Sequence, residues 1–115
     1  MARPRAGAPS KYKPEYGPML VDGARKGQTI SMFCDSIDIH KDTLYEWVKV
    51  HKEFSDHWKR ARQANEAWFE KLGLQGMAGK LKGFSAATFI FWMKAKHGWR
   101  DDQVVFEEES DLEFI

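Results

Sequence analysis

The side chains with the clearest chemical potential gather in one short segment, residues 28–52. Its apolar residues follow helical spacing in two short stretches, which are separated by a tight turn at 38–40. The second stretch, from about Lys41 to His51, has an apolar back formed by Leu44, Trp47 and Val48. Its outward residues are polar: His40, Lys41, Asp42, Tyr45, Glu46 and Lys49. Two short helices joined in this way are typical of a DNA-reading helix-turn-helix.

The outward side chains have chemical partners on DNA. Asp42 or Glu46 could accept a hydrogen bond from the amino group of cytosine, and Lys41 and Lys49 could contact phosphates or guanine. The two acids also weaken the attraction to phosphate, so the affinity of a single module should be low. The competing interpretation is a three-helix bundle that only encloses a core. Such a bundle has no need of a basic flanking segment, and the chain has one.

That flanking segment is residues 1–13, which mix basic residues with Pro, Gly and Ala and lack any apolar period. We expect a flexible basic arm there. Its cations are Arg3, Arg5, Lys11 and Lys13. Arms of this kind follow the phosphates or enter a minor groove, whereas the alternative is a disordered, solubilising start of the chain.

The elements that must position these residues are all predicted to be helices. A first helix is expected from about 14 to 26, with Pro18 tolerable only in its first turn and Gly27 as its stop. Thr29 is the expected N-cap of the next helix, and Asp38 takes the left-handed position of the turn. Two further helices are expected, at Glu53–Leu72 and Ser85–Lys96, and the glycines of 73–83 mark a bend or close helix packing. The fold class is therefore all-α, with the helix-turn-helix module at 14–52.

Residues 53–100 are predicted to form a helical hairpin that joins copies of the chain. Apolar residues of the long helix recur in a heptad pattern with one polar position, Asn65, and the last helix is apolar over more surface than one contact needs. The expected interface residues are Phe54, Trp58, Ala61, Asn65, Trp68, Leu72, Phe91 and Trp92. The aromatic residues could instead stack unpaired bases, but at helical spacing aromatics more often form core or subunit interface.

The net charge of +1 conceals a strong segregation, because residues 101–115 carry seven acidic and no basic side chains. We expect this tail to bind a partner protein, with apolar anchors at Phe106, Leu112, Phe114 and Ile115. Val104–Phe106 could form a short strand. A two-metal nuclease site built from these acids is disfavoured because they sit in one tail without a scaffold.

Several kinds of chemistry lack the residues they need. The segment GLQGMAGKL has Leu74 and Leu81 where a phosphate-binding loop requires Gly and Ser or Thr. No metal site is expected, because the four histidines have no ligand at metal-binding spacing. We therefore expect no cofactor and no enzymatic activity. The lone Cys34 and the absence of a long apolar run indicate a reducing compartment and no membrane insertion, hence the cytoplasm.

Three segments, SKYKPEY, TLYEWVKVHKEF and FIFWMKAKHGWRDD, occur in an order and spacing that resemble small terminase subunits of tailed bacteriophages. The resemblance covers about residues 10–102. It implies that the helix-turn-helix recognises viral DNA, that the central helices build a ring, and that the C-terminal part engages the large subunit, which holds the ATPase and nuclease. The short C-terminus departs from the family, which weakens the expectation of a large-subunit contact.

Together these features predict a DNA-recognition and regulatory subunit of a phage genome-packaging motor, acting in the host cytoplasm. Its expected partners are double-stranded viral DNA, the large terminase subunit and copies of itself. The main alternative is a dimeric helix-turn-helix transcription regulator or a transposase-type accessory protein, which would read paired half-sites one helical turn apart. A purely structural assembly protein is a third possibility, and it would bind no DNA.

Overall fold

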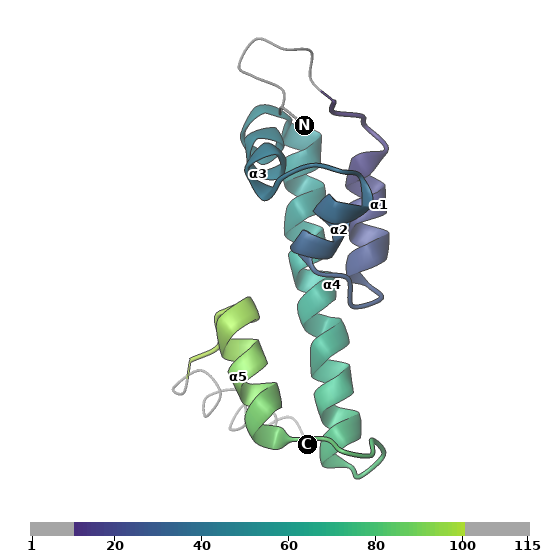
Figure 1. Cartoon of the computed structure of the whole chain (residues 1–115), viewed down its shortest axis with the longest axis vertical. Helices are drawn as coiled ribbons and strands as arrows, with labels where there is room; N and C mark the ends of the chain where they lie inside the picture. The colour runs from purple at the N-terminus through teal and green to yellow at the C-terminus, as the bar shows by residue number, and fades with distance from the viewer. Residues whose placement is uncertain (1–10, 101–115) are drawn as a thin grey trace, which may run out of the picture. The chain divides into compact units, whose positions relative to one another are not determined.

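A computed structural model of the chain describes residues 11–100, and in this part the chain forms five α-helices and no strand (Figure 1). The helices are α1 (Tyr16–Ala24), α2 (Ile30–Ser36), α3 (Lys41–Val50), α4 (Lys52–Met77) and α5 (Ala86–His97). The all-α prediction is confirmed. The expected strand at Val104–Phe106, the acidic tail and the first ten residues of the arm lie outside the described residues.

The chain divides between Asn65 and Glu66 into two compact units. The first unit contains α1, α2, α3 and the N-terminal half of α4, and the second contains the rest of α4 and α5. In the first unit, the three short helices lie around the upper half of α4 as drawn in Figure 1.

Local signals in the sequence account for the short helices of the first unit. Pro18 is the third residue of α1, where its missing N–H costs no intrahelical bond, and Gly27 lies just beyond the helix with φ +89°. Thr29 caps α2, since its hydroxyl accepts a hydrogen bond from the Met32 N–H at 3.2 Å. Asp38 has φ +56°, the left-handed conformation predicted for the turn before α3.

The core of the first unit is made by apolar residues from all four helices. Leu44 and Phe54 are fully enclosed, and the other buried members are Leu20, Val21, Ala24, Phe33, Cys34, Trp47 and Ala61. Cys34 is a small buried residue of this core, and burial raises the pKa of its thiol. Because α3 contributes Leu44 and Trp47 to this core, its remaining faces are held in a fixed orientation.

The side chain of Asn65 fixes the end of α1 to α4. Its Nδ2 donates to the Ala24 carbonyl at 3.1 Å and to the Gln28 carbonyl at 3.0 Å. The polar position in the apolar pattern of α4 therefore has a role within one chain, because it satisfies one carbonyl at the end of α1 and one carbonyl after it.

The helix α4 is longer than predicted. It continues to Met77, five residues beyond the predicted end at Leu72, so its end still falls within residues 73–83, where the glycines predict a bend. Gly73 and Gly76 lie inside the helix, and a Cβ at either position would collide with the ring of Phe89 or Phe84, respectively. The rings occupy the space left by the missing side chains, which offsets the low helix propensity of glycine. The alternative expectation of close helix packing is confirmed at Gly73, whose neighbour Phe89 belongs to the helix Ala86–His97, whereas Phe84 precedes that helix.

The helix α5 of the second unit has a clear signal at each end. The Ser85 hydroxyl accepts a hydrogen bond from the Thr88 N–H at 3.1 Å, and Gly98 ends the helix with φ +70°. Met93 is fully buried, and the Trp99 indole donates to the Glu66 carboxylate at 2.6 Å. Among the described residues of the second unit, Met93 is the one large apolar side chain that is fully buried.

Gly17 provides a test of how tightly α1 packs on α4. A Cβ at Gly17 would lie 2.6 Å from Nδ1 of His57, whose ring is held by a hydrogen bond of 2.7 Å to the Glu53 carbonyl. We expect Gly17→Ala to lower the free energy of unfolding by about 1–3 kcal/mol, measured by urea denaturation. The control is Gly23→Ala, where the three atoms nearest to the added Cβ all belong to the Gln28 side chain, whose far end can turn away. Equal effects of the two substitutions would contradict this account.

Candidate nucleic-acid interface

The helix α3 presents one exposed polar face above its buried side. Leu44 and Trp47 are buried and Val48 is half-buried, as its apolar spacing predicts. The exposed residues of the helix include five of the six side chains predicted to contact DNA: Lys41, Asp42, Tyr45, Glu46 and Lys49. They share a rigid backbone, which is the condition for holding donors and acceptors at fixed positions.

His40, the sixth of these side chains, is exposed and forms the N-cap of α3. Its Nδ1 accepts a hydrogen bond from the Asp42 N–H at 3.2 Å. The same Nδ1 lies 3.4 Å from the Asp42 carboxylate. His40 therefore has a structural role in starting the helix, through its contacts with the first turn of α3.

An aromatic and cationic cluster joins α3 to α4 within the first unit. The Tyr45 ring meets the Trp58 ring edge-on, with centroids 6.4 Å apart and an angle of 88°. The Arg62 guanidinium lies over the same Trp58 ring, 5.0 Å from its centroid. Arg62 thus adds an exposed cation to the surroundings of α3. It is absent from the sequence prediction, although its spacing of four residues from Trp58 could have indicated it.

The last residues of the predicted arm are anchored by Tyr12. Its ring stacks on His51 with centroids 3.7 Å apart and an angle of 9°, and meets Trp47 and Phe54 edge-on. Lys11 and Lys13 on either side of it are exposed. Arg3 and Arg5, the other cations of the arm, lie outside the described residues.

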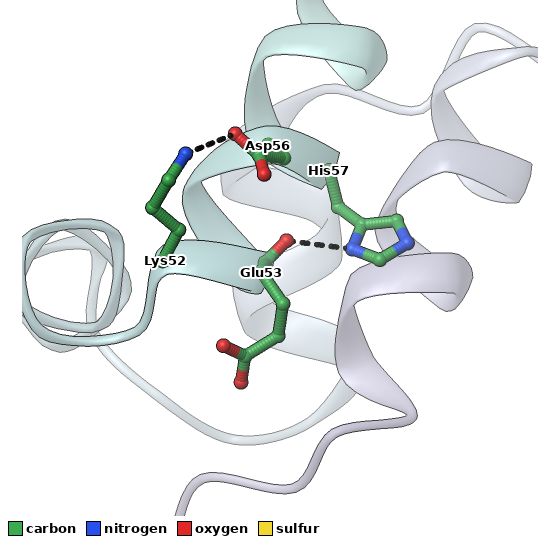
Figure 2. Close-up of polar contacts among 4 residues, drawn as sticks. All are labelled: Lys52, Glu53, Asp56 and His57. Carbon is green, nitrogen blue, oxygen red and sulfur yellow. Dashed lines mark hydrogen bonds and ion pairs between the residues drawn. The ribbon is translucent and has the colours of Figure 1, made fainter.

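The Tyr12 hydroxyl donates a hydrogen bond to the Glu53 carboxylate at 2.8 Å. Figure 2 shows the first turn of α4, where Lys52 pairs with Asp56 at 3.3 Å and the His57 ring meets the Glu53 carbonyl. The Glu53 carboxylate points away from these contacts. This orientation leaves the carboxylate available to Tyr12.

This hydrogen bond changes the acid–base behaviour of both partners. Burial, together with the contact to Glu53, raises the pKa of Tyr12 to about 12. The hydrogen bond from Tyr12 is the main cause that lowers the pKa of Glu53 below its ordinary value of 4.5. A lowered carboxyl pKa contributes stability that is present above the ordinary value and is lost as the pH falls through the folded-state value.

We expect the melting temperature of the wild type to fall as the solution is acidified below pH 4.5, in part because Glu53 is protonated. In Tyr12→Phe the hydrogen bond is absent, so this part of the acid dependence should be smaller. Thermal denaturation of both chains across the acidic range measures the difference. Identical pH profiles would show that the contact does not form in solution.

The residues predicted to join copies of the chain occupy different environments. Phe54 and Ala61 are enclosed by the core of the first unit and have no surface left for a second copy. Asn65 and Trp58 are half-buried and make the contacts described above. In the second unit, Trp68, Leu72 and Trp92 are half-buried, whereas Phe91 is 71% exposed.

The second unit exposes more apolar surface than the sequence prediction identified. Leu74 and Met77 are exposed on α4 and Ile90 joins Phe91 on α5, all with at least 41% of their surface accessible. Leu74 and Met77 were missed because the long helix was predicted to end at Leu72. Their separation of three residues on a helix places them on one face.

Within residues 11–100, no three His, Cys, Asp or Glu side chains lie close enough to hold a metal ion. None of the described helices is long and apolar enough to span a membrane.

These features define a small all-α protein in which a polar helix face is fixed on an aromatic core and flanked by cations. Residues 19–105 match the family model described as DNA-packaging protein gp3, so the chain belongs to this family. It is a phage DNA-packaging protein, which confirms that level of the sequence prediction. No match was found among curated proteins or among solved structures.

Proposed function

We propose that the chain is the DNA-recognition and regulatory subunit of a phage genome-packaging motor, equivalent to a small terminase subunit. The observation that carries the proposal is the exposed polar face of α3, fixed by Leu44 and Trp47 in a member of a DNA-packaging family. In this proposal α2 and α3 act as a helix-turn-helix, and α3 reads double-stranded viral DNA in the major groove. The chain itself hydrolyses neither ATP nor DNA.

The face of α3 and the N-terminal cations have separate roles in this mechanism. Lys41, Asp42, Tyr45, Glu46 and Lys49 project from a packed helix and discriminate bases. Arg3, Arg5, Lys11 and Lys13, with His40 and Arg62 at the edges of the module, contact phosphates and set the affinity without reading sequence. Because the α3 face holds two acids, one module binds weakly, and several modules in one assembly gain avidity on a contiguous duplex.

The assembly is a ring held by the second unit. Its exposed apolar residues, Leu74, Met77, Ile90 and Phe91, are the surface that copies of the chain would bury against each other. The acidic tail then contacts the large ATPase and nuclease subunit through Phe106, Leu112, Phe114 and Ile115, and the complex works in the host cytoplasm. Deleting residues 103–115 should preserve DNA binding and abolish stimulation of the large subunit.

DNA titrations at several salt concentrations test the proposal. Alanine at Lys41 or Lys49 should change the ranking of duplex sequences, with about 1–3 kcal/mol lost for each bidentate base contact. Alanine at Lys11 or Lys13 should weaken all duplexes alike and reduce the slope of log affinity against log salt by about 0.9 per contact. Lys82→Ala, at an exposed position in the second unit, is the matched control and should change neither.

Absence of DNA binding at low salt would refute the proposal and favour a purely structural role. The mass of the native assembly gives the second test. A mass above that of a dimer supports the ring, whereas a two-fold dimer that reads paired half-sites would identify a transcription regulator or a transposase-type accessory protein.

A further inference from the structure

We infer that Tyr12 is a positioning residue for DNA binding, which holds Lys11 and Lys13 at the corner where α3 meets α4. This inference rests on the proposed DNA-binding function and deepens it. According to this inference, the two lysines belong to the ordered surface of the first unit.

Four contacts from one side chain carry the inference. The Tyr12 ring stacks on His51 at 3.7 Å, and its centroid lies 5.4 Å from that of Trp47 and 5.8 Å from that of Phe54. Its hydroxyl donates to Glu53 at 2.8 Å. All four partners belong to residues 47–54, which include the end of α3, the start of α4 and the single residue between them. Contacts on the ring faces, on the ring edge and at the hydroxyl together determine both the place and the rotation of the side chain.

The anchor lies beside the proposed DNA-reading helix. Trp47 and His51 lie two residues to either side of Lys49 along the chain, so Tyr12 is fixed to the end of α3 that carries this exposed cation. Lys13 has a second restraint, because its ammonium group lies 6.0 Å from the centroid of the Tyr16 ring. Tyr12 itself is half-buried, and the lysines beside it are exposed.

The energetic consequence follows from chain entropy. A lysine on a free arm must be ordered when it contacts a phosphate, and the lost backbone freedom opposes binding. Where folding has already ordered the backbone at Lys11 and Lys13, DNA binding does not bear that cost again. Tyr12 therefore raises DNA affinity without touching DNA, and its whole effect passes through the two lysines.

A double-mutant cycle on the full chain tests this. We expect Tyr12→Ala to weaken binding to a mixed-sequence duplex by roughly tenfold at about 0.1 M salt and to reduce the salt slope by about 0.9, the effect of one lost phosphate contact. In a chain that already carries Lys11→Ala and Lys13→Ala, the same substitution should change neither quantity. Ile30→Ala is the control for stability alone, because Ile30 packs on the same core but is remote from the lysines in sequence. It should lower the melting temperature and leave the salt slope unchanged.

Each outcome of the cycle decides the inference. Equal losses of affinity from Tyr12→Ala in both backgrounds, or no loss in the wild-type background, would overturn it. If Tyr12→Ala does not fold, Tyr12→Leu keeps apolar bulk without the stack or the hydrogen bond, and absence of coupling in that variant overturns the inference equally. A wild-type chain that binds no DNA refutes the proposed function as well, whereas a binding wild type without coupling refutes only the role of Tyr12.

Discussion

Phe54→Ala is expected to lower the free energy of unfolding of the first unit by about 3–5 kcal/mol, the range found when buried Phe is truncated. Phe54 has no exposed surface, and its ring lies edge-on to both Trp47 and Tyr12. The substitution removes these contacts and leaves a cavity beneath the junction of α3 and α4. Urea denaturation followed by far-UV circular dichroism measures the loss.

The matched variant is Phe91→Ala, which removes the same side chain from a position that is 71% exposed. Its effect on the stability of the isolated chain should be within about 0.5 kcal/mol. Its effect on assembly should be large, since Phe91 belongs to the apolar surface that we propose copies of the chain bury. Native mass measurement at matched protein concentration separates the two variants. If Phe54→Ala is stable but dissociates, Phe54 belongs to the subunit interface. If Phe91→Ala keeps the mass of the wild-type assembly, Phe91 does not belong to that interface.

The contrast between these two phenylalanines shows what apolar spacing can and cannot predict. The heptad pattern of α4 identifies a helix with one apolar seam, and in the first unit the seam residues Phe54, Trp58 and Ala61 pack in or against the core. Spacing does not identify which element packs on the seam. In the first half of α4, the packing partners are the chain's own α1, α2 and α3, which enclose Phe54 and Ala61. An intermolecular interface and an intramolecular core require the same residue types at the same spacing.

The helix ends near α3 could be predicted because their causes are local. Thr29 accepts from an N–H three residues away, and Asp38 adopts a left-handed conformation that its own short side chain tolerates. The end of α4 could not be predicted in the same way. Gly73 and Gly76 weaken a helix when they are considered alone, but here each accommodates an aromatic ring from a residue 8 to 16 positions later. That compensation is tertiary and leaves no local signal.

The residues around α3 also fall into two groups, those that local sequence predicts and those that depend on tertiary contacts. The exposed face of the helix follows from its own periodicity, because Leu44 and Trp47 determine which side is buried. Arg62 and Tyr12 reach the same unit from α4 and from the segment before α1, through ring contacts that depend on the folded arrangement. Sequence spacing therefore predicted the α3 side chains and missed the residues that flank or position them.

The second large effect is expected at Asn65, where the size of the side chain can be kept while its hydrogen bonding is changed. The Nδ2 group donates to two carbonyls, and of these Ala24 also accepts from the Gly27 N–H at 3.1 Å. Asn65→Leu removes both donors and leaves the Gln28 carbonyl without this partner. We expect the free energy of unfolding to fall by about 2–3 kcal/mol, with no dependence on pH.

Asn65→Asp should lower the free energy of unfolding further at neutral pH, by about 3 kcal/mol or more. It places a carboxylate against two carbonyl oxygens, which cannot donate a hydrogen bond to it. The same surroundings favour the protonated carboxyl, so its pKa in the folded chain should be raised above the unfolded value of about 4. A raised folded-state pKa contributes stability that is present at low pH and is lost as the pH rises through that value. The deficit of Asn65→Asp relative to the wild type should therefore shrink on acidification, whereas that of Asn65→Leu stays constant. Urea denaturation of the three chains between about pH 4 and pH 7 measures these deficits, and parallel behaviour of the two variants would show that Asn65 does not face the two carbonyls.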